Sequence, residues 1–270
     1  MIKLALGAAA GALFAVASAA FAQQAFPTPL AAAEALVDGV ARHDDDAIAR
    51  TLGKDYANVL PVPSTSSEDV TTFLASWAEA RRIVPAGEAK AWLEVGRYGW
   101  TLPIPIVKGT SGWSFDVTAT ADELRTRRIG RNELDAIQVM RAYVDAQDEY
   151  KAGEGRGRYA TRLVAEPGKR DGLYWPQKPG TTPSPLGPYV AKGGPYAGYR
   201  FRQLPATDAA AAGALPVFVG WPAKWDDTGV KTFVVDRDGV VRQKDLGPES
   251  AARARAMSTY APDASWQKVD

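Results

Sequence analysis

Residues 232–243 read TFVVDRDGVVRQ, in which two runs rich in β-branched side chains flank the sequence Asp-Arg-Asp-Gly. Asp-Gly between two such runs is typical of a tight β-hairpin turn, because glycine readily adopts the backbone conformation that these turns require. We therefore expect an antiparallel pair of strands that reverses at residues 236–239. Shorter apolar runs at residues 198–201 and 217–220 extend the expected sheet.

A long helix is expected before this sheet, over residues 121–150. Its expected core-facing line consists of Leu134, Ile137, Met140 or Arg141, Val144 and Gln147. Gly130 lies inside the stretch and predicts a break, because glycine is a poor helix former. The glycines of residues 153–157 end the helix, and a short helix is expected over residues 248–257. One long helix on an antiparallel sheet predicts an α+β domain over residues 121–270.

Residues 23–120 predict a separate α+β domain that begins with helices. Apolar residues recur at helical spacing just after Pro29, and the run Asp44-Asp45-Asp46 can cap a second short helix. Ser66 opens a third helical section, which we expect to continue to Pro85.

The second part of this domain changes to the period of a β-strand. Apolar and polar side chains alternate along residues 90–95, 100–107 and 113–117, which predicts an antiparallel meander with a turn at residues 109–112. Two prolines, at positions 103 and 105, lack the N–H group that a strand ladder needs, so they suggest an edge strand or a bulge.

The first 22 residues have the three zones of a secretory signal peptide. Lys3 supplies the positive start, residues 4–16 the apolar centre, and residues 20–22 (Ala-Phe-Ala) a signal-peptidase pattern, so we expect cleavage before Gln23. A retained membrane anchor is the alternative, but only six strongly apolar side chains favour insertion, each by about 0.3–0.6 kcal/mol. We expect a periplasmic or secreted protein with no stable membrane span after cleavage.

Composition narrows the chemistry that the chain can perform. The sequence has 32 Lys and Arg against 31 Asp and Glu, one histidine and no cysteine. The absence of cysteine excludes disulfides, thiol nucleophiles and a cysteine-linked lipid anchor. A single histidine without cysteines argues against zinc and haem, and balanced charge argues against a nucleic-acid partner. We therefore expect no cofactor and no nucleic acid.

Five separated segments resemble an uncharacterised family of exported bacterial proteins, catalogued as domain of unknown function 2950. They are RRIGRNEL (127–134), AIQVMRAYVDAQDEY (136–150), GKRDGLYWP (168–176), SPLGP (184–188) and TFVVDRDGVVRQKDLG (232–247). The resemblance covers essentially the whole chain after the leader and implies no activity. Two weaker likenesses concern the fold. Residues 26–117 place helices before a sheet that ends in Gly-Trp-Ser-Phe-Asp (112–116), and in this they are similar to the cone-shaped fold of nuclear transport factor 2-like proteins. The second domain runs from a long helix into Tyr159-Ala160, a Gly-Tyr-Arg-Phe strand (198–201) and an Asp-Gly-Val hairpin (238–240), and in this it is similar to the globular head of type IV pilin-like proteins.

One candidate binding segment places three charged residues beside two aromatic rings. Its residues are Lys169, Arg170, Asp171, Tyr174 and Trp175. Aromatic faces with adjacent polar groups suit recognition of sugars or peptides. The alternative is that these side chains only pack a loop-rich domain. Further aromatic residues in nearby segments are Tyr189, Tyr196, Tyr199, Trp221 and Trp225.

A row of arginines at helical spacing is the second candidate. It consists of Arg125, Arg128 and Arg131 or Asn132, with Arg127 adjacent. Such a row can hold an acidic partner, an anionic headgroup or a phosphate. The alternative is that these residues form ion pairs with Asp122, Glu123, Glu133 and Asp135 near the junction of the two domains.

The sequence offers fewer features that indicate a catalytic or metal-binding site. His43 is the one histidine a Ser-His-Asp triad could use, and it lies beside three aspartates near a helix cap. Asp236 and Asp238 resemble part of a calcium loop, but Val234 stands where the first ligand is required, so no metal is expected. Paired carboxylates available for glycoside hydrolysis are Asp44 to Asp46, Asp226 with Asp227, and Glu133 with Asp135.

These observations favour a non-catalytic binding or assembly module of the cell envelope, whose partner is an envelope protein or glycan. A carboxylate-dependent hydrolase that acts on an envelope polymer is the alternative, so enzymatic activity stays open. A structural protein without any small ligand is the third hypothesis.

Overall fold

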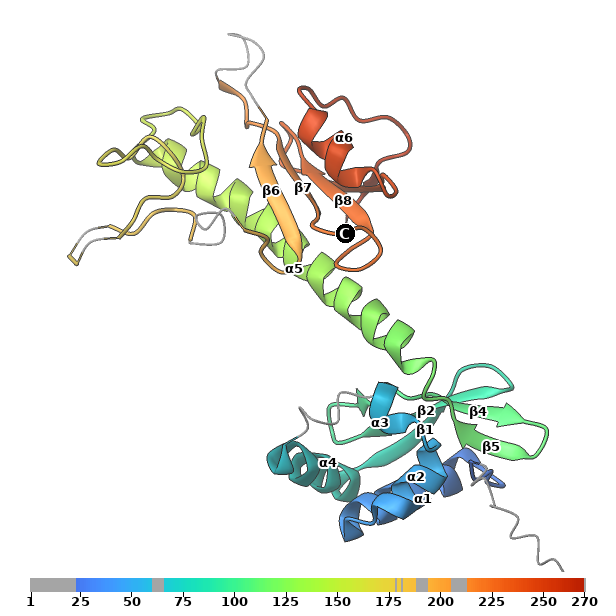
Figure 1. The fold of residues 1–270 in the computed structure, drawn as a ribbon. Coiled ribbons are helices and arrows are strands. Elements are labelled where there is room, and N and C mark those ends of the chain that lie inside the picture. Colours follow the sequence, from blue (N-terminus) through green and yellow to red (C-terminus); the bar gives the residue numbers. More distant parts are fainter. Residues whose placement is uncertain are drawn as a thin grey trace, which may run out of the picture. The chain divides into compact units, whose positions relative to one another are not determined.

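The computed structural model describes residues 23–59, 66–177, 179–180, 182–187, 194–204 and 213–269. The chain divides into two compact units, between Ala121 and Asp122 (Figure 1). Helices and antiparallel sheets occur in both units, which confirms the expected α+β fold in two parts. The predicted leader lies outside the described residues. No helix within the described ranges is long and apolar enough to cross a membrane.

The first unit begins with helices, two of which are capped where the sequence predicts a helix start. Their bounds are α1 (Pro29–Arg42), α2 (Asp45–Leu52), α3 (Tyr56–Val59) and α4 (Ser67–Glu79). The Asp44 carboxylate accepts a hydrogen bond from the Ala47 N–H at 2.8 Å and caps α2. Ser66 and Asp69 form a reciprocal capping box at the start of α4. These side chains satisfy backbone donors that have no partner inside the helix.

The sheet of the first unit is antiparallel, with strand order β1-β2-β4-β5 and β3 paired to β2. The strands are β1 (Arg81–Pro85), β2 (Lys90–Val95), β3 (Trp100–Thr101), β4 (Ile106–Gly109) and β5 (Gly112–Phe115). Alternate residues of β2 point into the core, where Leu93 and Val95 are almost fully buried. Ala33 and Leu36 of α1 belong to the same hydrophobic cluster, so the helices cover this face of the sheet.

Two details of the first unit differ from the sequence prediction. The third helical section ends at Glu79, and Arg81–Pro85 is a strand that pairs with β2 rather than the end of a helix. Ile83 and Val84 are β-branched, and pairing with β2 overrides the helical pattern. The predicted strand over residues 100–107 is interrupted between β3 and β4, where the two prolines lie.

The second unit contains one long helix, an antiparallel sheet and a short helix. The elements are α5 (Thr120–Ala152), β6 (Tyr199–Gln203), β7 (Phe218–Pro222), β8 (Lys231–Val235), β9 (Val241–Asp245), α6 (Ser250–Ala256) and β10 (Gln267–Lys268). The strand order is β10-β9-β8-β7-β6. The predicted hairpin is confirmed, since β8 pairs with β9 and Gly239 has a φ of 73° in the turn.

The two helices of this unit cover opposite faces of its sheet (Figure 1). Phe233 and Val235 of β8 face α5, where Tyr143 stacks on Phe218 with ring centroids 4.2 Å apart. Val234 points to the other face and packs in a cluster with Ala254 of α6. Because neighbouring residues of one strand serve two clusters, β8 is buried on both sides.

The long helix departs from its prediction in two ways. No break occurs at Gly130, and α5 is continuous from Thr120 to Ala152. The core-facing line is also rotated: Leu134 is 63% exposed. The buried side chains are Ala136, Val139, Met140, Tyr143, Ala146, Gln147 and Tyr150. Only Met140 and Gln147 of the expected line are fully buried, and Ile137 and Val144 are partly buried beside them.

Candidate functional site

The aromatic segment at residues 168–176 is held by ion pairs of its own. Lys169 pairs with Glu166, and Arg170 pairs with Glu154 in the turn that follows α5. Asp171 accepts a hydrogen bond from the Glu166 N–H at 2.9 Å. Lys169 lowers the pKa of Glu166, as Arg162 also does, so this carboxylate is held in its charged form. The three charged residues of the candidate thus have partners within the segment or next to it.

Trp175 is a core residue rather than an exposed ring. Its side chain is 7% exposed and packs in the same cluster as Tyr143 and Phe218. The Arg170 guanidinium lies 5.4 Å from the centroid of the Trp175 ring and covers it. Tyr174 is partly buried and forms an isolated bridge with Val164. Lys169 and Arg170 are therefore the accessible part of this candidate.

The other aromatic residues that the sequence groups with this segment do not form one surface. Tyr199 and Trp221 are buried, and Trp225 is partly buried and donates a hydrogen bond to Asp245 at 3.0 Å. Tyr196 is 37% exposed. Tyr189 lies outside the described residues.

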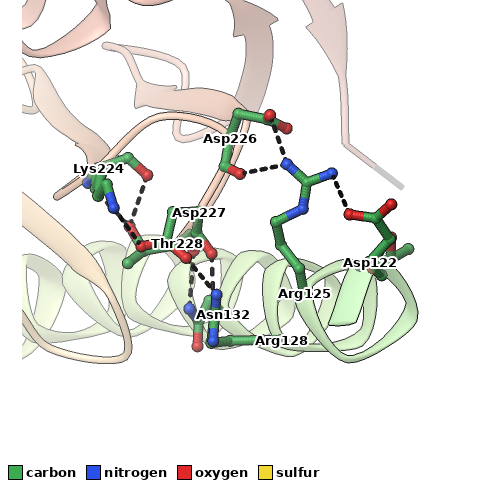
Figure 2. Close-up of polar contacts among 9 residues, drawn as sticks. Asp122, Arg125, Arg128, Asn132, Lys224, Asp226, Asp227 and Thr228 are labelled. Atoms are coloured by element: carbon green, nitrogen blue, oxygen red, sulfur yellow. Dashed lines mark hydrogen bonds and ion pairs between the residues drawn. The ribbon is translucent and has the colours of Figure 1, made fainter. Parts of the chain in front are cut away.

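The arginine row of α5 binds a loop of its own unit. Arg125 donates a hydrogen bond to the Asp226 carboxylate at 2.7 Å and also pairs with Asp122 (Figure 2). One turn further along the helix, Arg128 pairs with Asp227. Lys224 and Arg128 together lower the pKa of Asp227, with Lys224 the larger cause. These arginines therefore hold acidic partners from within the chain.

The next turn of α5 continues this contact through backbone groups of the same loop. The Asn132 amide donates to the Thr228 carbonyl oxygen at 2.8 Å. Glu133 accepts hydrogen bonds from the N–H groups of Val230 and Lys231, both at 2.9 Å. Arg131 is exposed, and no ion pair of its side chain is found among the described residues.

These contacts account for four of the carboxylates that the sequence offers for hydrolysis. Asp226 and Asp227 are neutralised by arginines, and Glu133 is committed to backbone donors. Asp44 is a helix cap. His43 is exposed and ends α1 in a left-handed conformation, with a φ of 54°. A general acid needs a raised pKa, whereas the pKa of Asp227 is lowered.

One pair of carboxylates remains in a partly desolvated setting, at the β8–β9 hairpin. Asp236 is 9% exposed and Asp238 follows it in the turn. Arg242 joins both, at 2.6 Å to Asp236 and 2.8 Å to Asp238. Burial raises the pKa of Asp236, whereas Arg242 lowers the pKa of Asp238 well below its usual range. Tyr260 lies nearby, and burial raises the pKa of its hydroxyl.

The first unit carries an exposed aromatic surface that sequence reasoning did not single out. Tyr98, in the turn between β2 and β3, is 90% exposed, and Trp100 is 51% exposed. Trp100 meets Phe73 of α4 edge to face, with centroids 6.2 Å apart. We call Phe73, Trp77, Arg97, Tyr98 and Trp100 the α4–turn surface. The sequence feature that could have predicted this surface is Arg-Tyr-Gly-Trp at residues 97–100, which lies between two strands, where side chains of a turn are exposed.

The fold and these surfaces define an α+β protein of two units whose described acidic groups serve mostly as structural partners. Residues 23–269 match the family described as "Protein of unknown function (DUF2950)", and the chain belongs to this family. No curated protein and no solved structure matches the chain.

Proposed function

We propose that the protein is exported to the cell envelope and acts there as a non-catalytic binding or assembly module. The α4–turn surface carries this proposal, because Tyr98 and Trp100 expose large apolar rings that contribute little to the core. Large apolar rings that contact water are energetically unfavourable unless a partner covers them, so such exposed rings are characteristic of binding surfaces. The ion pairs of Asp226 and Asp227 support the non-catalytic part.

Export is supported by the leader pattern and by the position at which the family match begins. The match starts at Gln23, the residue expected after cleavage. The Gln23 amide donates hydrogen bonds to the Phe115 and Thr51 carbonyl oxygens, at 2.7 and 3.1 Å. N-terminal sequencing of protein from a bacterial host is expected to begin at Gln23 in the envelope or secreted fraction. Met1 retained in a cytosolic fraction would contradict export.

The binding proposal is tested by retention of envelope material on the purified chain of residues 23–270. We expect a Tyr98→Ala, Trp100→Ala double variant to retain less envelope protein and glycan than the wild type. Leu134→Ala is the matched control, because Leu134 is an exposed apolar residue of the other unit. Arg170→Ala tests the accessible part of the aromatic segment separately. Equal retention by all four proteins would refute a binding role both for the α4–turn surface and for Arg170.

A hydrolase is the second candidate, and the Asp236–Asp238 pair is the observation that favours it. Two neighbouring carboxylates whose pKa values shift in opposite directions are a common arrangement of general acid and base. Turnover of a glycan or muropeptide that Asp238→Asn abolishes would establish this function. Identical turnover by the variant would remove it.

We also propose finer fold assignments for the two units. Helices on one face of an antiparallel sheet support the cone-shaped fold of nuclear transport factor 2-like proteins for the first unit. A long helix packed on an antiparallel sheet supports a pilin-like globular head for the second. An experimental structure of each unit, superposed on members of those folds, is the test.

A further inference from the structure

The α4–turn surface combines exposed rings with a backbone that holds them in place. The Gly96 N–H donates to the carbonyl oxygens of Ser76 and Ala80, at 3.1 and 2.9 Å, and so fixes the turn to the end of α4. Gly96 and Gly99 adopt positive φ angles of 74° and 69°, which close the turn that presents Tyr98. A ligand that stacks on these rings meets a preorganised surface, which reduces the ordering cost of binding.

Charge on this surface is nearly balanced. The Arg97 guanidinium pairs with Glu79 at 3.0 Å and lies 5.4 Å from the centroid of the Tyr98 ring. Arg81 lies 5.0 Å from the Trp77 ring. One carboxylate thus offsets one of the two guanidinium groups, and the remaining net charge of about +1 is too small to attract a polyanion or an anionic membrane strongly. The exposed aromatic rings therefore decide the class of ligand more than charge does.

The rings and the charged groups also differ in what they offer to a ligand. An exposed aromatic face packs against apolar C–H groups. The adjacent guanidinium and carboxylate, which already pair with each other, keep further donors and acceptors for hydroxyl groups. A ligand that presents C–H groups on one face and hydroxyl groups along its edges matches both features. Pyranose sugars have this character.

We infer that the α4–turn surface binds a neutral polysaccharide chain, with sugar rings stacked on Tyr98 and Trp100 and hydroxyl groups hydrogen-bonded to Arg97 and Glu79. This inference rests on the proposed binding function and names its ligand class. Tyr98 and Trp100 are two residues apart, so their Cα atoms lie at most ~7 Å from each other.

The test uses the purified chain of residues 23–270 and the hexamer of N-acetylglucosamine, with titration calorimetry as the readout. We expect binding that changes little with ionic strength, because the ligand is uncharged. Tyr98→Ala and Trp100→Ala are each expected to weaken affinity about tenfold, the scale of one lost aromatic contact. Tyr98→Phe is expected to retain affinity, because it keeps the ring.

Tyr196→Ala is the matched control, an exposed tyrosine of the second unit whose loss is expected to leave affinity unchanged. Tyr98 is almost fully exposed, so its replacement is not expected to unfold the protein, and a thermal melt of each variant verifies this.

Three results would overturn the inference. The first is hexamer binding that Tyr98→Ala and Trp100→Ala leave unaltered. The second is no hexamer binding while vesicles of anionic phospholipid bind through these residues. The third is no hexamer binding while the chain forms a dimer that Tyr98→Ala dissociates. If envelope material is still retained through Tyr98 and Trp100 without hexamer binding, the ligand class fails but the binding function stands.

Discussion

Gly229 lies where the ring of Tyr199 leaves no room for a side chain. A Cβ atom at position 229 would lie 2.2 Å from the Tyr199 hydroxyl oxygen and 2.5 Å from its Cε2. Tyr199 is fully buried and donates a hydrogen bond to the Lys231 carbonyl oxygen at 2.8 Å, so it cannot move aside freely. We predict that Gly229→Ala lowers the free energy of unfolding by about 1–3 kcal/mol, measured by urea denaturation.

Gly130 provides the opposite case within the same unit. A Cβ atom there would meet nothing within 4 Å, and the residue is exposed in the interior of α5. We predict that Gly130→Ala raises the free energy of unfolding by roughly 0.5–1 kcal/mol, because alanine loses less backbone entropy on folding. Destabilisation by this substitution would show that α5 bends or opens at Gly130.

At the scale of elements, two kinds of interaction join α5 to the loop that precedes β8: hydrogen bonds from a side chain to backbone N–H groups, and a solvent-exposed ion pair. Glu133 accepts hydrogen bonds from the N–H groups of Val230 and Lys231. Arg128 forms an ion pair with Asp227, and the Arg128 side chain is 47% exposed. We predict that Glu133→Ala costs about 1–3 kcal/mol of stability. Arg128→Ala is expected to cost less than about 1 kcal/mol.

Urea denaturation of both variants in low and high salt provides the measurement. Salt should reduce the effect of Arg128→Ala, because the pair is solvent-exposed, and change that of Glu133→Ala much less. An equal loss of unfolding free energy in the two variants would contradict the prediction that the Glu133 hydrogen bonds stabilise the fold more than the Arg128 ion pair does.

The start of α4 has a predicted pH dependence. Hydrogen bonds from the Ser66 N–H and hydroxyl lower the pKa of Asp69 below its usual value. A carboxylate with a lowered pKa stabilises the fold above its unfolded pKa of ~4, and this contribution disappears as the pH falls through the folded pKa. We predict that an NMR titration of Asp69 gives a lowered pKa, which Ser66→Ala raises. The same pKa in both proteins would contradict the capping box.

Local sequence signals predicted the elements whose ends are set by a few neighbouring residues. The Ser66 cap, the Asp44 cap and the Asp-Gly hairpin turn all occur as expected, because each depends on contacts within about four residues. β1 was missed because its pairing with β2 is a tertiary contact. The rotated face of α5 was missed because the expected line was drawn through Leu134, which is exposed, whereas the buried line runs through Ala136, Val139 and Tyr143.

Gln147 is a predicted core position that the structure confirms, although its side chain is polar. Its amide exchanges hydrogen bonds with the Ala160 backbone, at 2.8 Å to the N–H and 3.0 Å to the carbonyl oxygen, and also donates to the Tyr143 hydroxyl. A buried polar residue whose hydrogen-bond partners are all supplied is compatible with a core. Helical spacing placed Gln147 on the core-facing line, but it did not predict these partners.

At the scale of the whole molecule, the candidate site was the least predictable feature. The aromatic segment that the sequence favoured contributes Trp175 to the core, whereas Tyr98 and Trp100 are exposed. Both sets have the same residue types beside charged neighbours. Which set is exposed depends on how distant strands and helices pack, and this information is absent from local spacing.

The two units have separate cores, and this separation predicts how the chain responds to core mutations. The cluster of the first unit uses residues between Phe26 and Val117, whereas both clusters of the second begin at or after Ala136. Leu93→Ala and Phe218→Ala each remove a fully buried side chain, one from each unit, and are expected to cost about 2–5 kcal/mol. Because the cores share no side chain, hydrogen exchange followed by mass spectrometry should show faster exchange only in the mutated unit. Faster exchange in both units after either substitution would mean that the continuous helix α5, which begins at Thr120, couples them into one cooperative fold.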